Sequence, residues 1–404
     1  MRVVVIGAGI TGTLVGRELQ LAGHDVTILE ARYVGAGSSS RSAAGIRQQF
    51  STPGTVQGIR FSLGFYRAFS QHTEGGISPL VQNGYLFLHD TDEAHESAGV
   101  RVAMQHDAGL VEVERLEPHE IARRFPWLAE GAFTGATYCP TDGFLHPQVI
   151  YQEAARNLLQ AGGVVHQNAP VTEAKLGPGG IERVMTPKGA FEADLFIDCS
   201  NAWTPRLAEI LGAGELPVCA RKRYLWFLKR NAGFDGATLA NMPLTVAPSG
   251  TYFRPENLET LMFGRKHDAP SERDFSYDDQ DEIEPDYSHK SGIDARPFEL
   301  WAELAEVFPD VGEFDGLVAT TGGYYAESPD HNPFLGYDLA QRNLIRLVGF
   351  SGHGAMMGPF TARVASRLVE AGRDVPEVDL GDATVPLAAF ALDREFDAHE
   401  QMVI

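Results

Sequence analysis

The chain opens with a strand, a glycine motif and a helix in the order that a dinucleotide-binding fold requires. The β-branched run Arg2–Ile6 is typical of a buried parallel strand. The GAGITG motif of residues 7–12 follows at once, and the next apolar residues recur at helical spacing. A second apolar run over 24–30 ends in the acid Glu30. This order predicts a Rossmann-type fold, and a glycine-rich turn in another kind of α/β protein is a much weaker alternative.

Each of the three glycines in this motif has a structural role that requires the absence of a side chain. Gly7 permits a tight turn, Gly9 lets the backbone approach a pyrophosphate, and Gly12 lets the helix pack on the strand. The start of the helix offers free N–H groups and a positive dipole end to phosphates, and the following acid can accept hydrogen bonds from a ribose diol. We expect the dinucleotide to contact Gly7, Gly9, Ile10, Thr11, Gly12, Glu30, Ala31 and Arg32.

The stretch GAGSSSRSAAGIRQQF, residues 35–50, favours FAD over NAD as that dinucleotide. The hydroxyl and backbone N–H groups of a second loop of small residues can close over the pyrophosphate of the longer cofactor. A flexible Gly/Ser linker is the alternative, but an apolar, patterned segment follows directly. The loop residues that we expect to contact FAD are Ser38, Ser39, Ser40, Ser42, Ala43, Ala44, Gly45 and Ile46.

Length and charge exclude several classes of protein. A chain of 404 residues predicts two domains, and 44% hydrophobic with 22% charged residues is an ordinary globular composition. The net charge of −21 argues against nucleic acid or an anionic membrane surface as a partner, because both need clustered cations. The acid-rich stretch 268–294 predicts a solvated loop.

The cysteines and the apolar runs bear on the compartment. Cys139, Cys199 and Cys219 are scattered, which fits a reducing compartment, and no CxxC or His/Cys cluster indicates a metal site. No apolar run approaches the roughly 18 residues of a membrane helix, and no signal segment precedes the glycine motif. We therefore expect a cytoplasmic location, no membrane insertion and no metal.

Four segments of the chain together resemble the D-amino acid oxidase (DAO) superfamily, in its sarcosine oxidase and dimethylglycine dehydrogenase branch. They are the loop over 35–50, the strand and turn FIDCSNAW over 196–203, the segment over 322–333, and the second glycine loop LVGFSGHG over 347–354, with a helix predicted over 360–370. The resemblance implies further FAD contacts from Val171, Ser200, Asn201, Ala202, Trp203, Gly323, Tyr324, Gly352, His353, Gly354, Ala355 and Met356.

Shorter patterns are similar to a mitochondrial group of FAD-dependent oxidoreductase domain-containing proteins linked to assembly of respiratory complex I. They are GI-x-QQFS-x-P over 45–53, FPW over 125–127, RKRY over 221–224, SGHG over 351–354 and the tail 402–404. The resemblance spans essentially the whole chain. It keeps a second class of function open, a flavin-containing assembly or interaction factor without a free metabolite as substrate.

The resemblance implies an α/β fold (α+β overall), in which a Rossmann-type FAD-binding domain is joined to a discontinuous antiparallel-sheet substrate domain. The FAD-binding domain is expected at 1–80, 147–216 and 321–404, and the substrate domain at 81–146 and 217–320. Apolar periodicity predicts a helix over 149–160 and strands over 164–167, 85–88, 224–228, 252–253 and 261–263.

The same resemblance points to three residues for substrate chemistry. Arg47 matches an arginine that binds a substrate carboxylate, although a phosphate or surface contact stays open. Tyr252 matches an active-site tyrosine, with core packing as the alternative, and of Tyr324 and Tyr325 we assign the second to the substrate. For His353 in the flavin loop, we expect the backbone to matter more than the imidazole.

Three departures from the family pattern refine this prediction. Met262 stands where sarcosine oxidases have an oxygen-activating lysine, and Lys266 lies nearby in the sequence as a substitute cation. Met356 stands at the position of a second family lysine, which assists carboxylate binding. The cysteine that attaches flavin covalently falls near Gly323, so we expect non-covalent FAD, with a histidyl link left open.

We predict an FAD-dependent oxidoreductase, a dehydrogenase or slow oxidase, that oxidises the C–N bond of a small secondary or N-methyl amino acid. Sarcosine, proline and opines are examples of such substrates. Hydride passes to the flavin, and the cofactor supplies the difficult chemistry. A homo-oligomer or a partner subunit remains open.

Overall fold

The structure is a computed structural model that describes residues 1–266, 288–289, 292–293, 296–396 and 399–402. Of the acid-rich stretch 268–294, only two short strands are therefore described, β18 (Ser288–His289) and β19 (Gly292–Ile293). The prediction of a solvated loop there falls largely outside the described residues.

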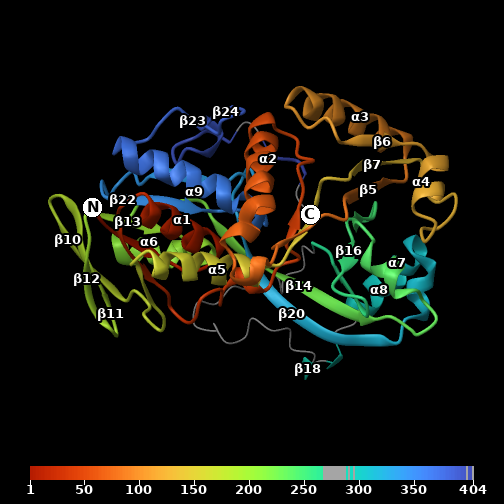
Figure 1. Cartoon of the computed structure of the whole chain (residues 1–404), viewed down its shortest axis with the longest axis horizontal. Helices are drawn as coiled ribbons and strands as arrows, with labels where there is room; N and C mark the ends of the chain where they lie inside the picture. The colour runs from red at the N-terminus through yellow and green to blue at the C-terminus, as the bar shows by residue number, and fades with distance from the viewer. Residues whose placement is uncertain (267–287, 290–291, 294–295, 397–398, 403–404) are drawn as a thin grey trace.

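A six-stranded sheet forms the half of the molecule on the left of Figure 1. Its strand order is β21-β22-β13-β1-β2-β9, and all neighbours are parallel except the edge pair β21 and β22. The predicted first strand lies at the centre because it is buried on both faces. The strands are β1 (Arg2–Ile6), β2 (Asp25–Leu29), β9 (Val164–His166), β13 (Leu195–Asp198), β21 (Phe334–Tyr337) and β22 (Leu344–Val348).

Three helices pack together over this sheet. Helix α1 (Ile10–Leu21) contacts both α5 (Pro147–Gln160) and α9 (Gly354–Ala371), as the colours in Figure 1 show for segments far apart in the sequence. The helix predicted over 149–160 and the strands predicted at 2–6 and 24–30 are thereby confirmed, with boundaries shifted by a residue or two.

Helix α9 begins earlier than the sequence predicts. A start at 360 follows from Pro359, but the helix begins at Gly354 and contains this proline. Proline removes the N–H that would bond to the carbonyl of Ala355, and the hydroxyl of Tyr66 donates to that oxygen instead, at 2.6 Å. Ser62, also on helix α2 (Pro53–Ala68), accepts from the N–H of Phe360 at 3.1 Å. A neighbouring helix therefore repairs the turn that the proline disturbs.

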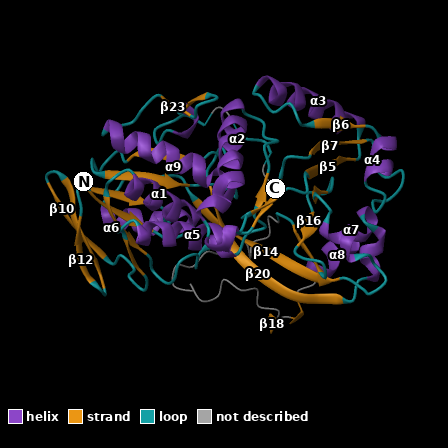
Figure 2. Ribbon diagram, in the orientation of Figure 1, coloured by secondary structure: helices purple, strands orange, loops and turns teal. Residues whose placement is uncertain are grey.

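An eight-stranded sheet forms the other half of the molecule, and its long strands β14 and β20 run toward the first half (Figure 2). The predicted substrate-domain strands are all present here. The sheet is antiparallel except where β15 runs parallel to β5. The strand order is β20 (Gly316–Glu327), β14 (Cys219–Lys229), β17 (Thr260–Gly264), β16 (Tyr252–Pro255), β15 (Leu244–Val246), β5 (Tyr85–His89), β7 (Gly135–Cys139) and β6 (Glu114–Leu116).

The domain boundaries stay predictions, but β20 crosses the one placed at residue 321. A small third sheet joins the two halves, with β3 (Gly45–Ile46) and β4 (Leu80–Val81) both paired to β8 (Gly143–Leu145). This sheet ties the loop of small residues to the other half. A polar three-stranded meander was missed by the sequence reasoning; its strands are β10 (Glu173–Gly177), β11 (Gly180–Thr186) and β12 (Gly189–Glu192).

A buried arginine holds the edge of the six-stranded sheet to the turn after β13. Arg346 on β22 donates to Asp198 at 2.9 Å, to Asp338 at 3.1 Å and to Thr204 at 2.5 Å. Asp198 in turn accepts from the N–H and hydroxyl of Ser200 at 2.8 and 2.6 Å. This network therefore sets the backbone that follows β13.

We predict that Arg346→Met destabilises the fold by about 3–5 kcal/mol, because it leaves two buried carboxylates without their cation. Urea unfolding of the FAD-loaded protein measures this loss. Arg367→Met is the matched control, since the Arg367–Glu370 pair is largely exposed and should contribute less than about 1 kcal/mol. Similar small losses for both variants would contradict the prediction.

Candidate active site

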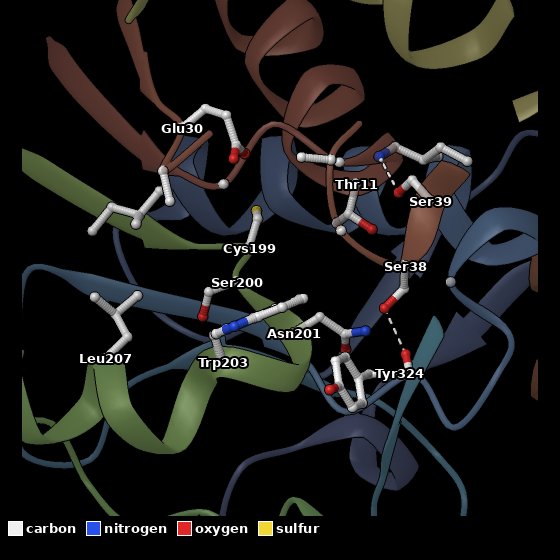
Figure 3. A pocket seen from close by; sticks show the side chains of 18 of the residues that line it. Thr11, Glu30, Ser38, Ser39, Cys199, Ser200, Asn201, Trp203, Leu207 and Tyr324 are labelled. Atoms are coloured by element: carbon white, nitrogen blue, oxygen red, sulfur yellow. Dashed lines mark hydrogen bonds between the residues drawn. The ribbon is translucent and has the colours of Figure 1, made fainter. Parts of the chain in front are cut away.

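A cavity of about 530 Å³ opens at the carboxyl ends of the parallel strands. The β1–α1 turn, the end of β2, the turn after β13, the loop of small residues, β20 and the start of α9 all reach it (Figure 3). This edge is where ligands bind in open α/β sheets. The predicted cofactor residues that line it are Gly7, Gly9, Ile10, Thr11, Glu30, Ala31, Arg32, Ser38, Ser39, Ser42, Val171, Ser200, Asn201, Trp203, Gly323, Tyr324, Gly352, Gly354 and Ala355.

The glycines of the first motif stand where no side chain fits. Gly7 has φ +107°, and a Cβ there would lie 2.8 Å from the carbonyl oxygen of Cys199. At Gly12 a Cβ would lie 1.9 Å from the carbonyl oxygen of Gly7, so the helix could not approach the strand. At Gly9 it would lie 2.9 Å from the hydroxyl of Ser39. The motif therefore forms a cradle that only bare backbone can line.

Hydrogen bonds position the polar groups around this cradle. The carboxylate of Glu30 accepts from the N–H of Ala8 at 2.8 Å and of Arg32 at 2.9 Å, and burial raises the pKa of this carboxyl. The hydroxyl of Ser39 accepts from the N–H of Ile10 at 3.0 Å, and that of Ser38 donates to the carbonyl of Tyr324 at 2.5 Å, the two bonds dashed in Figure 3. The loop of small residues is thus bound both to α1 and to β20.

These features fit FAD. Gly9 begins helix α1 without a side-chain capping bond, which leaves N–H groups of the first turn for a phosphate. Glu30 stands at the end of β2, where an acid binds a ribose. The far end of the cavity is lined by apolar side chains that suit an adenine ring, and the sequence reasoning missed several of them, including Leu207, Ile210 and Pro170.

A second, smaller cavity of about 30 Å³ adjoins the first. Ser42, Tyr325, Gly352 and Ala355 line both cavities. The small one brings together Arg47, Tyr252 and Tyr325, the three residues that the sequence assigns to the substrate. Also on its walls are the predicted Ala43, Ala44, Gly45, His353 and Met356, and the unpredicted Tyr85, Leu244 and Ser351.

Some predicted residues do not reach these cavities. Gly12, Ser40, Ile46 and Ala202 line neither of the two, although Gly12 packs directly beneath the motif. Lys266 also lines neither; it lies close enough to His331 to lower the pKa of that imidazole, after the larger effect of burial. The predicted contacts of these residues with cofactor or substrate stay predictions without a cavity to support them.

Arg47 is buried, with a side chain only 1% exposed. Its Nη1 donates to the carbonyl of Gln49 at 3.0 Å and its Nη2 donates to the carbonyl of Met402. Its guanidinium carbon lies 4.0 Å from the centre of the Phe50 ring. Within the described part of the chain, its Nε has no hydrogen-bond partner. A phosphate contact, the alternative left open by the sequence, is not favoured, because Arg47 lines only the small cavity and not the large one.

A buried carboxylate that the charge of Arg47 reaches was missed by the sequence reasoning. Asp142 is fully buried and accepts hydrogen bonds from the side chains of Gln48 at 2.8 Å and Gln49 at 3.1 Å. Burial raises the pKa of its carboxyl to about 6, and the Gln48 and Gln49 hydrogen bonds and then the Arg47 charge oppose this rise. Asp142 therefore holds the two glutamines that follow Arg47 in the chain.

The remaining titratable groups of the small cavity are neutral. Burial raises the pKa of both phenols, Tyr252 and Tyr325, and the two groups hydrogen-bond to each other. Burial, reinforced by the charge of Arg47, lowers the pKa of His353 well below its usual value. Arg47 is thus the one charged side chain among the described residues that line this cavity.

A dinucleotide cradle beside a small cavity with one buried cation defines the class: an oxidoreductase that carries its own dinucleotide. The chain belongs to the DAO family of FAD-dependent oxidoreductases, whose family model matches residues 2–368. FAD is therefore the cofactor, as the sequence predicts.

Relatives agree with this assignment. FAD-dependent oxidoreductase domain-containing protein 1 of Xenopus laevis is 26% identical over 97% of this chain and 82% of its own. Glycine oxidase of Pseudomonas aeruginosa is 26% identical over 94% of this chain and 96% of its own. The crystal structure of L-proline dehydrogenase from P. horikoshii has the same fold, with a TM-score of 0.81 at 24% identity over 92% of this chain and 94% of that one.

The described residues show neither a membrane-spanning helix nor a metal-binding cluster. No described helix is long and apolar enough to cross a membrane. No three His, Cys, Asp or Glu side chains in the described ranges are grouped so that they could hold a metal ion.

We predict that FAD is bound without a covalent link. Cys199 lines the large cavity, but burial raises the pKa of its thiol well above the usual value, so the thiol is a poor nucleophile. Acid precipitation of the purified protein should give a colourless pellet and a yellow supernatant. A yellow pellet would contradict the prediction, and mass spectrometry of flavin peptides would then show whether a histidine carries the link.

Proposed function

We propose that this FAD-dependent oxidoreductase oxidises the C–N bond of a small secondary or N-methyl amino acid, such as sarcosine, proline or an opine. The observation that carries the proposal is the small cavity, which sets the buried guanidinium of Arg47 beside the cofactor cavity. A buried arginine recognises a carboxylate because its planar fork matches the two oxygens. Relatives named glycine oxidase and sarcosine dehydrogenase support a small amino acid as substrate.

The size of the cavity supports a small substrate as well. About 30 Å³ admits a carboxylate or a methyl group but no large side chain. Its walls are mostly apolar or small, with Leu244 and Met356 among them. The bound substrate is therefore shielded from water, which strengthens its pairing with a charged group.

In the proposed reaction, FAD supplies the acceptor for a hydride equivalent from the amine-bearing carbon. Arg47 binds the carboxylate and so orients that carbon. The phenols of Tyr252 and Tyr325 are neutral, and because one donates to the other, one hydroxyl hydrogen is left to donate to the substrate. The guanidinium also disfavours a second positive charge in the same cavity, so it favours entry of the substrate as its neutral amine, which has already lost its proton to the solvent.

One observation favours the second candidate, a flavin-containing assembly or interaction factor without a free metabolite. The backbone carbonyl of Met402 already accepts a hydrogen bond from Arg47, the group that a free substrate needs. Anaerobic mixing of the holoenzyme with a panel of small amino acids separates the two functions. Bleaching of the flavin supports the oxidoreductase, and an unbleached flavin with every member of the panel supports the factor.

Location and assembly remain predictions. The expected cytoplasmic location differs from that of one relative, the human sarcosine dehydrogenase, whose name places it in mitochondria. A homo-oligomer or a partner subunit stays open in the same way.

We predict that Arg47→Ala weakens binding of a carboxylate-bearing substrate by about ten- to a hundredfold, since a buried charge-assisted pair contributes roughly 1.5–3 kcal/mol. FAD content should stay unchanged, because Arg47 does not line the large cavity. Flavin occupancy and the apparent dissociation constant are measured on the same preparation.

Arg47→Lys is the graded control for this variant. It keeps the charge but loses the fork, so it should fall between the wild type and the alanine variant. Loss of flavin with unchanged substrate affinity would show that Arg47 serves the pyrophosphate instead.

We predict that the reduced enzyme reoxidises slowly in air and faster with a quinone or a dye. Met262, at the position of the oxygen-activating lysine, is fully buried in an apolar cluster with Tyr85 and Tyr252, so no cation stands there to attract oxygen. Stopped-flow reoxidation after anaerobic reduction measures both rates. Rapid peroxide formation that disappears in Lys266→Met would overturn the prediction and identify Lys266 as the substitute cation.

A further inference from the structure

Residues 400–402, here called the strap, lie across the loop that carries Arg47. The carboxylate of Glu400, only 1% exposed, accepts from the N–H of Ser51 at 2.8 Å, from its hydroxyl at 2.5 Å and from the hydroxyl of Thr52 at 3.2 Å. The N–H of Gln401 donates back to the hydroxyl of Ser51 at 2.8 Å. The strap is therefore attached through one carboxylate and two hydroxyl-bearing residues.

Met402 brings the strap to the small cavity. Its N–H donates to Glu400 at 3.0 Å, which turns its own carbonyl toward Arg47, and this carbonyl accepts from Nη2. The Met402 side chain packs against the same apolar cluster as Tyr85 and Tyr252. A backbone carbonyl thus takes the place on Arg47 that an oxygen of a substrate carboxylate would take.

A separate clamp holds the chain just before the strap. Arg394 donates to both oxygens of Asp330, each at 2.8 Å, and to the carbonyl of Asn332 at 2.7 Å. The N–H of Glu400 bonds to the carbonyl of Asp330 at 3.0 Å. Release of the Ser51 and Arg47 contacts can therefore free Gln401 and Met402, while the Arg394 clamp and the bond from the N–H of Glu400 to Asp330 stay in place.

We propose that the strap is a specificity element that occupies Arg47 until a carboxylate displaces it. Glu400 is the positioning residue that sets how readily the strap is displaced. A carboxylate competes well with the Met402 carbonyl, because it brings a negative charge and two oxygens to the planar fork of Arg47, where the carbonyl offers one neutral oxygen. A neutral amide has no such advantage and leaves the strap in place. The site thereby selects amino acids over neutral amines of the same shape. This inference rests on the proposed role of Arg47.

Acetate and acetamide are the probes, because they have nearly the same shape and differ in charge. Each is titrated into the FAD-loaded protein at constant ionic strength, with flavin absorbance as the binding signal and hydrogen exchange of the peptide that covers residues 399–402 as the strap signal. Acetate should raise deuterium uptake in that peptide, because the N–H of Gln401 loses its acceptor, the hydroxyl of Ser51. Acetamide should leave uptake unchanged.

Two variants loosen the strap, and a third variant serves as the matched control. Glu400→Gln and Ser51→Ala weaken its attachment, so acetate should bind about tenfold more tightly and the preference for acetate over acetamide should shrink by a similar factor. Gln401→Ala alters only an exposed side chain of the same strap and should behave like the wild type. A purely structural role for Glu400 would lower the melting temperature without changing the ratio of the two affinities.

The outcomes distinguish a failure of the strap proposal from a failure of the proposed function. Acetate binding that depends on Arg47 but leaves exchange at 399–402 unchanged overturns the strap and keeps the proposed function. An unchanged acetate-to-acetamide ratio in both loosened variants does the same. Acetate binding that survives in Arg47→Ala, or binding in neither the wild type nor Glu400→Gln, overturns the role of Arg47 and the strap with it.

Discussion

The site depends first on a close approach of backbone to backbone at the β1–α1 turn. Helix α1 lies so near the strand that a single methyl group at Gly12 would fall 1.9 Å from the carbonyl oxygen of Gly7. This contact aims the start of the helix at the edge of the sheet, and its dipole and N–H groups then favour an anionic ligand there. The turn after β13 closes on the same point, because a Cβ at Gly7 would meet Cys199. The large cavity is the space that these three segments leave.

The substrate side rests on a different principle, the burial of one charge. Arg47 lies almost wholly out of water, and such a charge needs partners for its N–H groups. Backbone carbonyls, the face of Phe50 and the more distant carboxylate of Asp142 supply part of this compensation. Nε has no described partner, so the compensation is incomplete. An incompletely paired guanidinium inside an apolar cavity is poised to accept an anion.

Local patterns in the sequence predict the cofactor side well. Strand, glycine motif, helix and acid are contiguous, so each shows its periodicity or its special residue within a short window. The resemblance adds Arg47, Tyr252 and Tyr325, which the structure gathers around one cavity. Their assignment to the substrate still awaits the binding experiments.

The missed features depend on pairings that no short window contains. Tyr85 reaches the small cavity only because β5 pairs with β15 across a long separation in the chain. The early start of α9 depends on hydroxyls from α2, and the contact between Arg47 and Met402 joins opposite ends of the sequence. The outer strands of the meander, β10 and β12, are largely exposed and lack the buried alternation that makes a strand visible, while Ile181 and Val184 of β11 are buried.

Burial of charge also bears on Met262, which the resemblance aligns with a lysine. Met262 is wholly enclosed on β17, and its antiparallel neighbour Arg254 already carries a buried charge. A lysine at 262 would bury another cation beside Arg254, with desolvation and like-charge repulsion both against it. Methionine removes that cost and fills the space between strands. The result is a cavity with a single cation among its described residues, so the proposed recognition of a carboxylate and the proposed control by the strap both depend on Arg47.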